Sequence, residues 1–157
     1  MVKSLNNILS LKFIDILRHV GKFSQPSSHV FADASQRAFG AVAYLVENSV
    51  VSLVLAKSRL APINAPSLPQ LELTSLNVAA RFVTESYRAE LSFAQTYLWT
   101  ASEIVLCWTK QQSNKKPYVT QRLNNIRTLC PNAQINHVPS KQNPRRSSDP
   151  RSLCEGV

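Results

Sequence analysis

Three strand-like segments follow one another closely in the first half of the chain, and they constrain the fold more than any other feature. They span residues 29–35, 39–47 and 50–58, and each is rich in apolar and β-branched residues. Only Asn48 and Ser49 separate the second segment from the third, a length typical of a tight β-hairpin. The sequence therefore predicts that the fold begins with antiparallel strands.

Helical and strand patterns alternate in the rest of the chain. The prolines of residues 59–69 predict an irregular connection, and a helix is then expected over 67–87, with Ser67 and Gln70 at capping-box spacing. A second capping box, formed by Thr100 and Glu103, predicts another helix start. The remaining expected elements are a helix over 4–18, a strand over 92–99, helices over 100–112 and 119–130, and a strand over 133–139. This order predicts an α/β fold, a mixed sheet covered by helices.

The composition indicates one folded domain with an anionic partner. The chain has 157 residues, 44% of them hydrophobic, and 18 Lys plus Arg against 9 Asp plus Glu give a net charge of +9. Such a surplus favours nucleic acid first and an anionic membrane surface second. The three cysteines lack the spacing of a zinc site or a disulfide framework, which favours a reducing, intracellular location. No apolar run is long enough to span a membrane.

Four blocks of sequence carry a family resemblance when they are taken together and in order. They read FADAS…AFGAVAYL, AKSRLAP…PQLELTSL, LWTASEIVLCW and INHVPSKQNP. Together they resemble the ribonuclease H domain of retroelement polyproteins, above all the BEL/Pao group of long-terminal-repeat retrotransposons. The resemblance covers residues 28–144 and implies a ribonuclease H-like sheet of five strands, three antiparallel and then two parallel. Residues 1–27 are then expected to form a helical connection segment, and residues 145–157 a basic, disordered tail.

The resemblance also implies a metal-dependent active site. In that family four carboxylates hold two Mg²⁺ (or Mn²⁺) ions and the enzyme cleaves the RNA strand of an RNA–DNA hybrid. Two dications roughly 4 Å apart repel each other, so several anionic oxygens must surround them. By residue-to-residue matching, Asp33 and Glu72 are the first two metal ligands, whereas Ala101 and Arg146 stand at the third and fourth positions. The sequence therefore predicts a copy that is inactive or nearly so.

Each remaining carboxylate also has a structural explanation. Asp33, taken alone, fits a turn-forming residue after a strand, and only the surrounding blocks favour the ligand role. Glu72 fits equally well as an acid near a helix N-terminus. Glu103 is not an obvious replacement for the carboxylate missing at Ala101, because one residue along a helix rotates a side chain by about 100°.

Basic residues of the second half suggest how nucleic acid could bind. Lys115, Lys116 and Arg122 lie in the cluster KQQSNKKPYVTQR and are candidate phosphate contacts, although an exposed helix face explains them equally well. The tail after Pro144 departs from the family pattern and is predicted to be frameshifted. The expected partners are an RNA–DNA hybrid and the reverse transcriptase and integrase domains of the same polyprotein, with no membrane. The alternatives are a non-catalytic binding module that uses residues 110–122, and a non-functional product of a decayed element.

Overall fold

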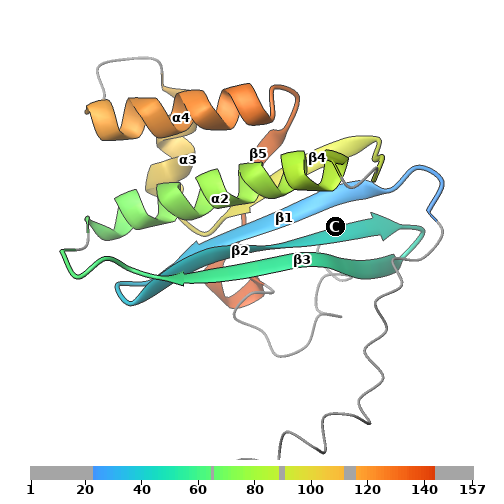
Figure 1. The fold of residues 1–157 in the computed structure, drawn as a ribbon, viewed down its shortest axis with the longest axis horizontal. Coiled ribbons are helices and arrows are strands. Elements are labelled where there is room, and N and C mark those ends of the chain that lie inside the picture. Colours follow the sequence, from blue (N-terminus) through green and yellow to red (C-terminus); the bar gives the residue numbers. More distant parts are fainter. Residues whose placement is uncertain (1–22, 65, 89–90, 112–115, 144–157) are drawn as a thin grey trace, which may run out of the picture.

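The structure, a computed structural model, describes residues 23–64, 66–88, 91–111 and 116–143 (Figure 1). The elements are β1 (Ser27–Ala34), β2 (Ala38–Glu47), β3 (Val50–Leu60), α2 (Leu68–Arg88), β4 (Gln95–Thr100), α3 (Glu103–Lys110), α4 (Pro117–Leu129), β5 (Gln134–His137) and a short 3₁₀ turn, η2 (Ser140–Gln142). The expected helix over 4–18 and the tail over 145–157 lie outside the described residues.

The strands form one five-stranded sheet in the order β3-β2-β1-β4-β5. β1 pairs with β2, and β2 with β3, in antiparallel fashion, whereas the β1–β4 and β4–β5 pairs are parallel. The expected fold, three antiparallel strands followed by two parallel ones, is confirmed. The parallel pairs require crossover connections, and the helices that follow β3 and β4 provide them.

The β2–β3 hairpin turns as the sequence predicts. Asn48 and Ser49 have φ angles of 49° and 67°, which suit the two central positions of a type I′ turn. β3 is longer than expected and continues to Leu60, which pairs with Ala38. The irregular segment was expected to begin at residue 59, but it begins two residues later, after Leu60. The reason is that its first proline is Pro62, so the preceding residues keep the N–H groups that a strand needs.

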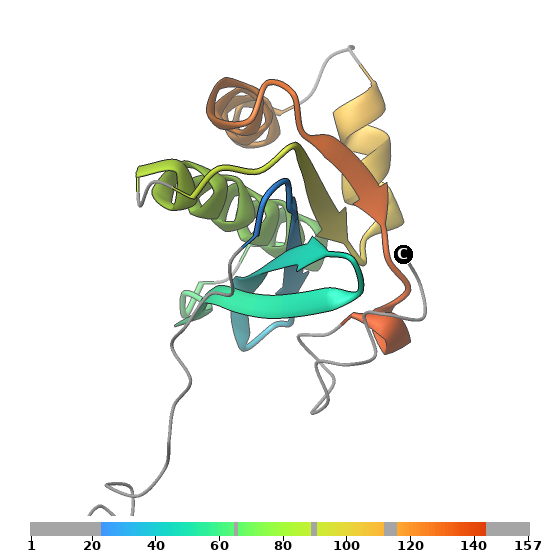
Figure 2. The same ribbon diagram turned by 90° about the vertical axis from the view of Figure 1, so that its right-hand side faces the viewer.

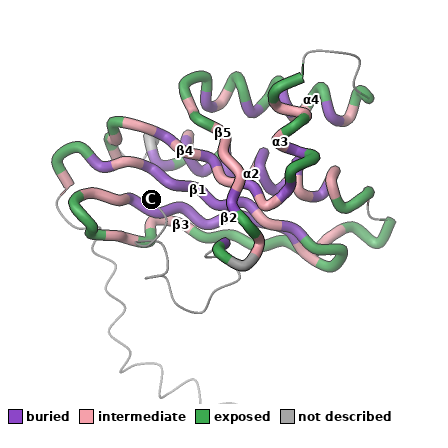
Figure 3. Tube along the Cα trace, turned by 180° about the vertical axis from the view of Figure 1, so that it is seen from behind, coloured by how far each residue is buried: buried purple, intermediate pink, exposed green. Residues whose placement is uncertain are grey.

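The core lies mainly between the sheet and α2, and α4 packs beside α2 (Figures 1 and 2). Val30 of β1, Leu76 of α2 and Leu98 of β4 are completely buried there. The alternate residues of β1 face the other side of the sheet, where Phe31 packs with Tyr44 and other buried residues. Most residues of β1 and β2 are buried, and the edge strand β3 is the most exposed (Figure 3). The central strand that carries Asp33 is thus fixed from both faces.

Helix caps set the connections that matter for the site. The backbone N–H of Ser67 donates to Oε1 of Gln70 at 3.0 Å, as the first capping box predicts. The predicted N-cap at Thr100 is wrong by two residues. The N-cap of α3 is Ser102, whose Oγ accepts from the N–H of Val105 at 3.3 Å. Thr100 instead ends β4, and its hydroxyl oxygen accepts from the N–H of Ser102 at 3.2 Å. Only two residues therefore join β4 to α3.

A buried histidine on β1 makes stability depend on pH. Nδ1 of His29 accepts from Nε1 of Trp99 at 3.2 Å, Nε2 lies 3.1 Å from Oγ of Ser27, and burial lowers the pKa of His29 from 6.5 to about 4. The unfolded chain therefore binds this proton more readily. Neutral His29 makes its full contribution to the free energy of unfolding above pH 6.5. This contribution is lost as the pH falls toward 4, by at most about 1.4 kcal/mol per pH unit.

Urea unfolding between pH 7 and pH 4.5 tests this expectation. The wild-type chain should lose more free energy of unfolding over this range than His29→Gln, which cannot take up the proton. The comparison removes the contribution of carboxylates, which titrate in both proteins. Equal pH dependence in the two proteins would contradict the role of His29.

Candidate active site

The carboxyl ends of two neighbouring parallel strands define one edge of the sheet. Ala32 of β1 pairs with Thr100 of the adjacent strand β4. Asp33 and Ala101 each follow one of these paired residues. Both are half-buried. The crevice outside the carboxyl ends of parallel strands is where open α/β sheets place their ligands. The strand register therefore brings Asp33 and the position of Ala101 to a suitable edge.

Helix α2 is attached to this same edge by a buried hydroxyl. Ser75 is fully buried, and its Oγ donates to the carbonyl oxygen of Asp33 at 2.8 Å and also contacts the carbonyl of Gly40, the strand partner of Asp33. Glu72 precedes Ser75 by three residues and is half-buried. Residues three apart share a helix face, so Glu72 lies on the face of α2 that approaches the edge.

The segment before residue 144 is attached beside Asp33 as well. Asn143 is completely buried, and its Nδ2 donates to the carbonyl oxygen of Ala32 at 3.1 Å. The N–H of Val138 donates to the carbonyl oxygen of Thr100 at 3.0 Å. The closing segment therefore contacts the ends of both parallel strands. Arg146 follows it and lies outside the described residues.

The described donor groups at this edge are too few for a two-metal centre. The described residues supply two carboxylates, Asp33 and Glu72, and Ala101 supplies none. No group of three or more His, Cys, Asp or Glu suited to a metal ion is found within the described ranges. One or two carboxylates suffice for a single Mg²⁺ that keeps most of its water, but two adjacent ions require more.

Two further residues, which the sequence patterns do not single out, hold the backbone at this edge. Ser75 and Asn143 are both buried and both donate to carbonyl groups at the end of β1. The available signal for Ser75 is its polar side chain among the apolar residues Leu71, Leu73, Leu76, Ala79 and Ala80 of the 67–87 helix. For Asn143 the signal is its place in INHVPSKQNP, one of the four blocks that carry the family resemblance.

The comparisons with known proteins decide the family. Residues 1–102, well over half of the chain, match the family described as "Pao retrotransposon-like RNaseH-like domain". The chain belongs to this family. The match includes residues 1–27, and the expected domain boundary at residue 28 stays a prediction. A comparison with curated proteins finds no match.

Solved ribonuclease H structures share the fold of this Pao-type domain. LC11-RNase H1, solved in complex with an RNA/DNA hybrid, is 16% identical with a TM-score of 0.56, and the match covers 77% of this chain and 90% of that one. RNase H1 from Halobacterium salinarum NRC-1 is 19% identical with a TM-score of 0.52, over 78% and 91%. The prototype foamy virus protease-reverse transcriptase is 13% identical with a TM-score of 0.50, over 90% of this chain and 21% of that chain.

The predicted phosphate contacts differ in their surroundings. Lys116 is exposed at the N-cap of α4, and Lys115 lies outside the described residues. Arg122 is half-buried, with Cζ 3.4 Å from the centroid of the Tyr118 ring and Nε donating to Oγ1 of Thr74 at 3.1 Å. The side chain of Arg122 therefore connects α4 to α2, a role that the basic cluster alone does not reveal.

Within the described part of the Pao-type domain, no helix is long and apolar enough to span a membrane.

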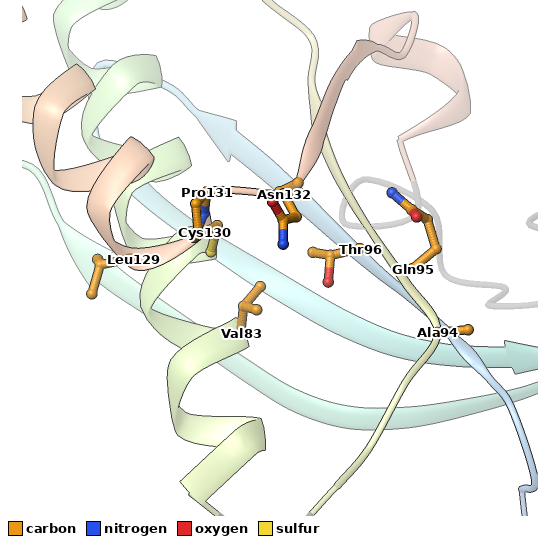
Figure 4. A pocket seen from close by; sticks show the side chains of 9 residues that line it. Val83, Ala94, Gln95, Thr96, Leu129, Cys130, Pro131 and Asn132 are labelled. Atoms are coloured by element: carbon orange, nitrogen blue, oxygen red, sulfur yellow. The ribbon is translucent and has the colours of Figure 1, made fainter.

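A cavity of about 230 Å³ lies at the opposite ends of the strands (Figure 4). Its lining includes Gln95 and Thr96 at the start of β4, and Cys130 after α4. Burial raises the pKa of the Cys130 thiol to about 11, and Sγ donates to the carbonyl oxygen of Ala80 at 3.3 Å. A thiol with this pKa is protonated and a poor nucleophile at neutral pH. This cavity is therefore separate from the candidate active site and has no evident catalytic group.

Proposed function

We propose that this chain is the ribonuclease H-type domain of a retrotransposon polyprotein. In this proposal the domain binds an RNA–DNA hybrid but no longer hydrolyses the RNA strand. The observation that carries the proposal is Ala101, which stands beside Asp33 at the carboxyl end of β4, where the family places its third carboxylate. Removing a preorganised electrostatic group commonly costs about 10²- to 10³-fold in rate. Arg146 at the fourth position adds a cation where a dication would have to bind.

Nucleic acid is the partner that the charge and the fold support. The net charge of +9 attracts a polyanion, and LC11-RNase H1 of the same fold was solved with an RNA/DNA hybrid. In the proposal, Lys115, Lys116 and Arg122 contact backbone phosphates. The similarity to a foamy virus protease-reverse transcriptase supports reverse transcriptase as a neighbouring domain of the same polyprotein, with integrase a further candidate.

A short, end-labelled RNA–DNA hybrid tests both parts of this proposal. With Mg²⁺ or Mn²⁺ present, the purified chain should retard the hybrid in a native gel in a salt-dependent manner and leave the RNA strand intact. Lys116→Ala should weaken binding modestly, by a factor of about 8 at 0.1 M salt if it removes one phosphate contact.

The outcomes separate the competing functions. Metal-dependent cleavage that disappears in Asp33→Asn would show that the remaining carboxylates suffice, and the proposed loss of activity would be wrong. Absence of both binding and cleavage from a folded chain would favour the non-functional product of a decayed element.

A further inference from the structure

A polar groove lies over the outer side of α2, between the β2–β3 strands and α4. It encloses about 200 Å³ and is lined by residues from all of these elements. α2 lies between α4 and the β2–β3 strands (Figure 1), so the groove connects segments that are distant in sequence. Three arginines contribute to it, one from each side and one from the middle: Arg59 of β3, Arg81 of α2 and Arg122 of α4.

The lining offers hydrogen-bond donors and positive charge together. Asn77, Gln121 and Asn125 add three carboxamides to the three arginines, and no Asp or Glu is among the described residues that line the groove. Three guanidinium cations around one groove repel one another, and an anion bound between them relieves this repulsion. Planar guanidinium groups bind phosphate in a bidentate manner. This combination is typical of a site for a phosphate group.

Part of the groove is held in place before any ligand binds. Nε of Arg122 donates to Thr74 at 3.1 Å, Nη1 donates to the carbonyl oxygen of Tyr118 at 3.4 Å, and the guanidinium covers the ring of Tyr118. The hydroxyl groups of Thr74 and Tyr118 lie 2.9 Å apart. Asn77, largely buried, donates from Nδ2 to the carbonyl oxygen of Arg122 at 3.3 Å. Less side-chain entropy is therefore lost when Arg122 binds an anion.

We propose that this groove binds a backbone phosphate of nucleic acid through Arg59, Arg81 and Arg122. The volume of about 200 Å³ is several times the roughly 30 Å³ that a water molecule occupies in the liquid, so a phosphate group fits. The proposal rests on the proposed function for the identity of its macromolecular ligand. It adds Arg59 and Arg81, which the basic cluster of residues 110–122 does not contain, as a second point of attachment.

Hybrid binding by arginine variants tests the groove. Anisotropy of a labelled RNA–DNA hybrid is measured from 0.05 to 0.3 M salt for the wild type and for Arg59→Gln/Arg81→Gln. Losing two phosphate contacts should reduce the slope of log K against log salt by about 2 and the affinity at 0.1 M salt by about 10- to 60-fold. Arg127→Gln is the control for the loss of one positive charge, because Arg127 is exposed on α4 and does not line the groove. It should change log K by well under half of the change in the double variant, and circular dichroism confirms that each variant is folded.

A titration with inorganic phosphate, followed by the arginine Nε–H signals in nuclear magnetic resonance, separates this proposal from the proposed function. Shifts at Arg59, Arg81 and Arg122, but not at Arg127, are expected. If these shifts occur while the wild type binds no hybrid, the proposed function fails and the groove is a site for free phosphate. If the wild type binds hybrid and the double variant binds equally well, the groove proposal is overturned. It is also overturned if neither the shifts nor hybrid binding is seen.

Discussion

Under the proposed function, placing carboxylates at positions 101 and 146 should give hydrolysis of the RNA strand. Ala101→Asp/Arg146→Asp is expected to cleave an RNA–DNA hybrid with Mg²⁺ at least about 10²-fold faster than the wild type, because each change returns an anionic oxygen to the shell around the ions. The position of Ala101 supports this result. It follows Thr100 on β4 as Asp33 follows Ala32 on β1, so a carboxylate there lies beside Asp33. Single-turnover cleavage of labelled RNA measures the gain.

Two further variants show whether any gain comes from charge. Ala101→Asn with Arg146→Asp has nearly the shape of the restored protein without the negative charge at position 101, and it should cleave more slowly than the restored protein. Adding Asp33→Asn to the restored protein should abolish the recovered cleavage. If the restored protein binds the hybrid but does not cleave its RNA strand, the active site has lost more than these two groups.

The fold could be predicted from local patterns because those patterns agree with one another. The hairpin at Asn48 and Ser49, the cap at Ser67 and the order of strands and helices all follow from short-range physics. The errors occurred at element ends. Thr100 and Ser102 are both polar and both precede an apolar helix, and the sequence does not say which hydroxyl accepts from the first turn. In the structure the β4 pairing extends to Thr100, so the capping role passes to Ser102.

The candidate site was less predictable, because it depends on contacts between distant segments. The family resemblance predicts Asp33, Glu72 and the position of Ala101 as site positions, yet no periodicity shows that Ser75 would bind the carbonyl of Asp33 forty-two residues away. The Nδ2 of Asn143 reaches Ala32 across a still longer separation. The polar groove over α2 is not predictable for the same reason, since its three arginines come from three different elements. A basic cluster along the chain is visible in sequence, but a cluster in space is not.

The largest loss of stability is expected from truncating the helix residue that joins α2 to the sheet. Leu76 is 0% exposed, and it belongs to the cluster that includes Val30 of β1 and Leu98 of β4. Leu76→Ala should lower the free energy of unfolding by about 2–5 kcal/mol, the sum of lost apolar burial and the remaining cavity. For a chain of this size the melting temperature should fall by about 5–15 °C, which calorimetry measures.

The effect should extend to the active-site edge, because Leu76 is adjacent to Ser75, whose hydroxyl attaches α2 to the end of β1. Leu68→Ala is the matched control: it removes the same atoms from the same helix, but Leu68 is 40% exposed, and the expected cost is below about 1.5 kcal/mol. Equal destabilisation by the two variants would mean that α2 is not held to the sheet through Leu76. The positions of Glu72 and Asp33 would then need another explanation, since the packing of α2 on β1 is what brings a helix carboxylate to the end of a strand.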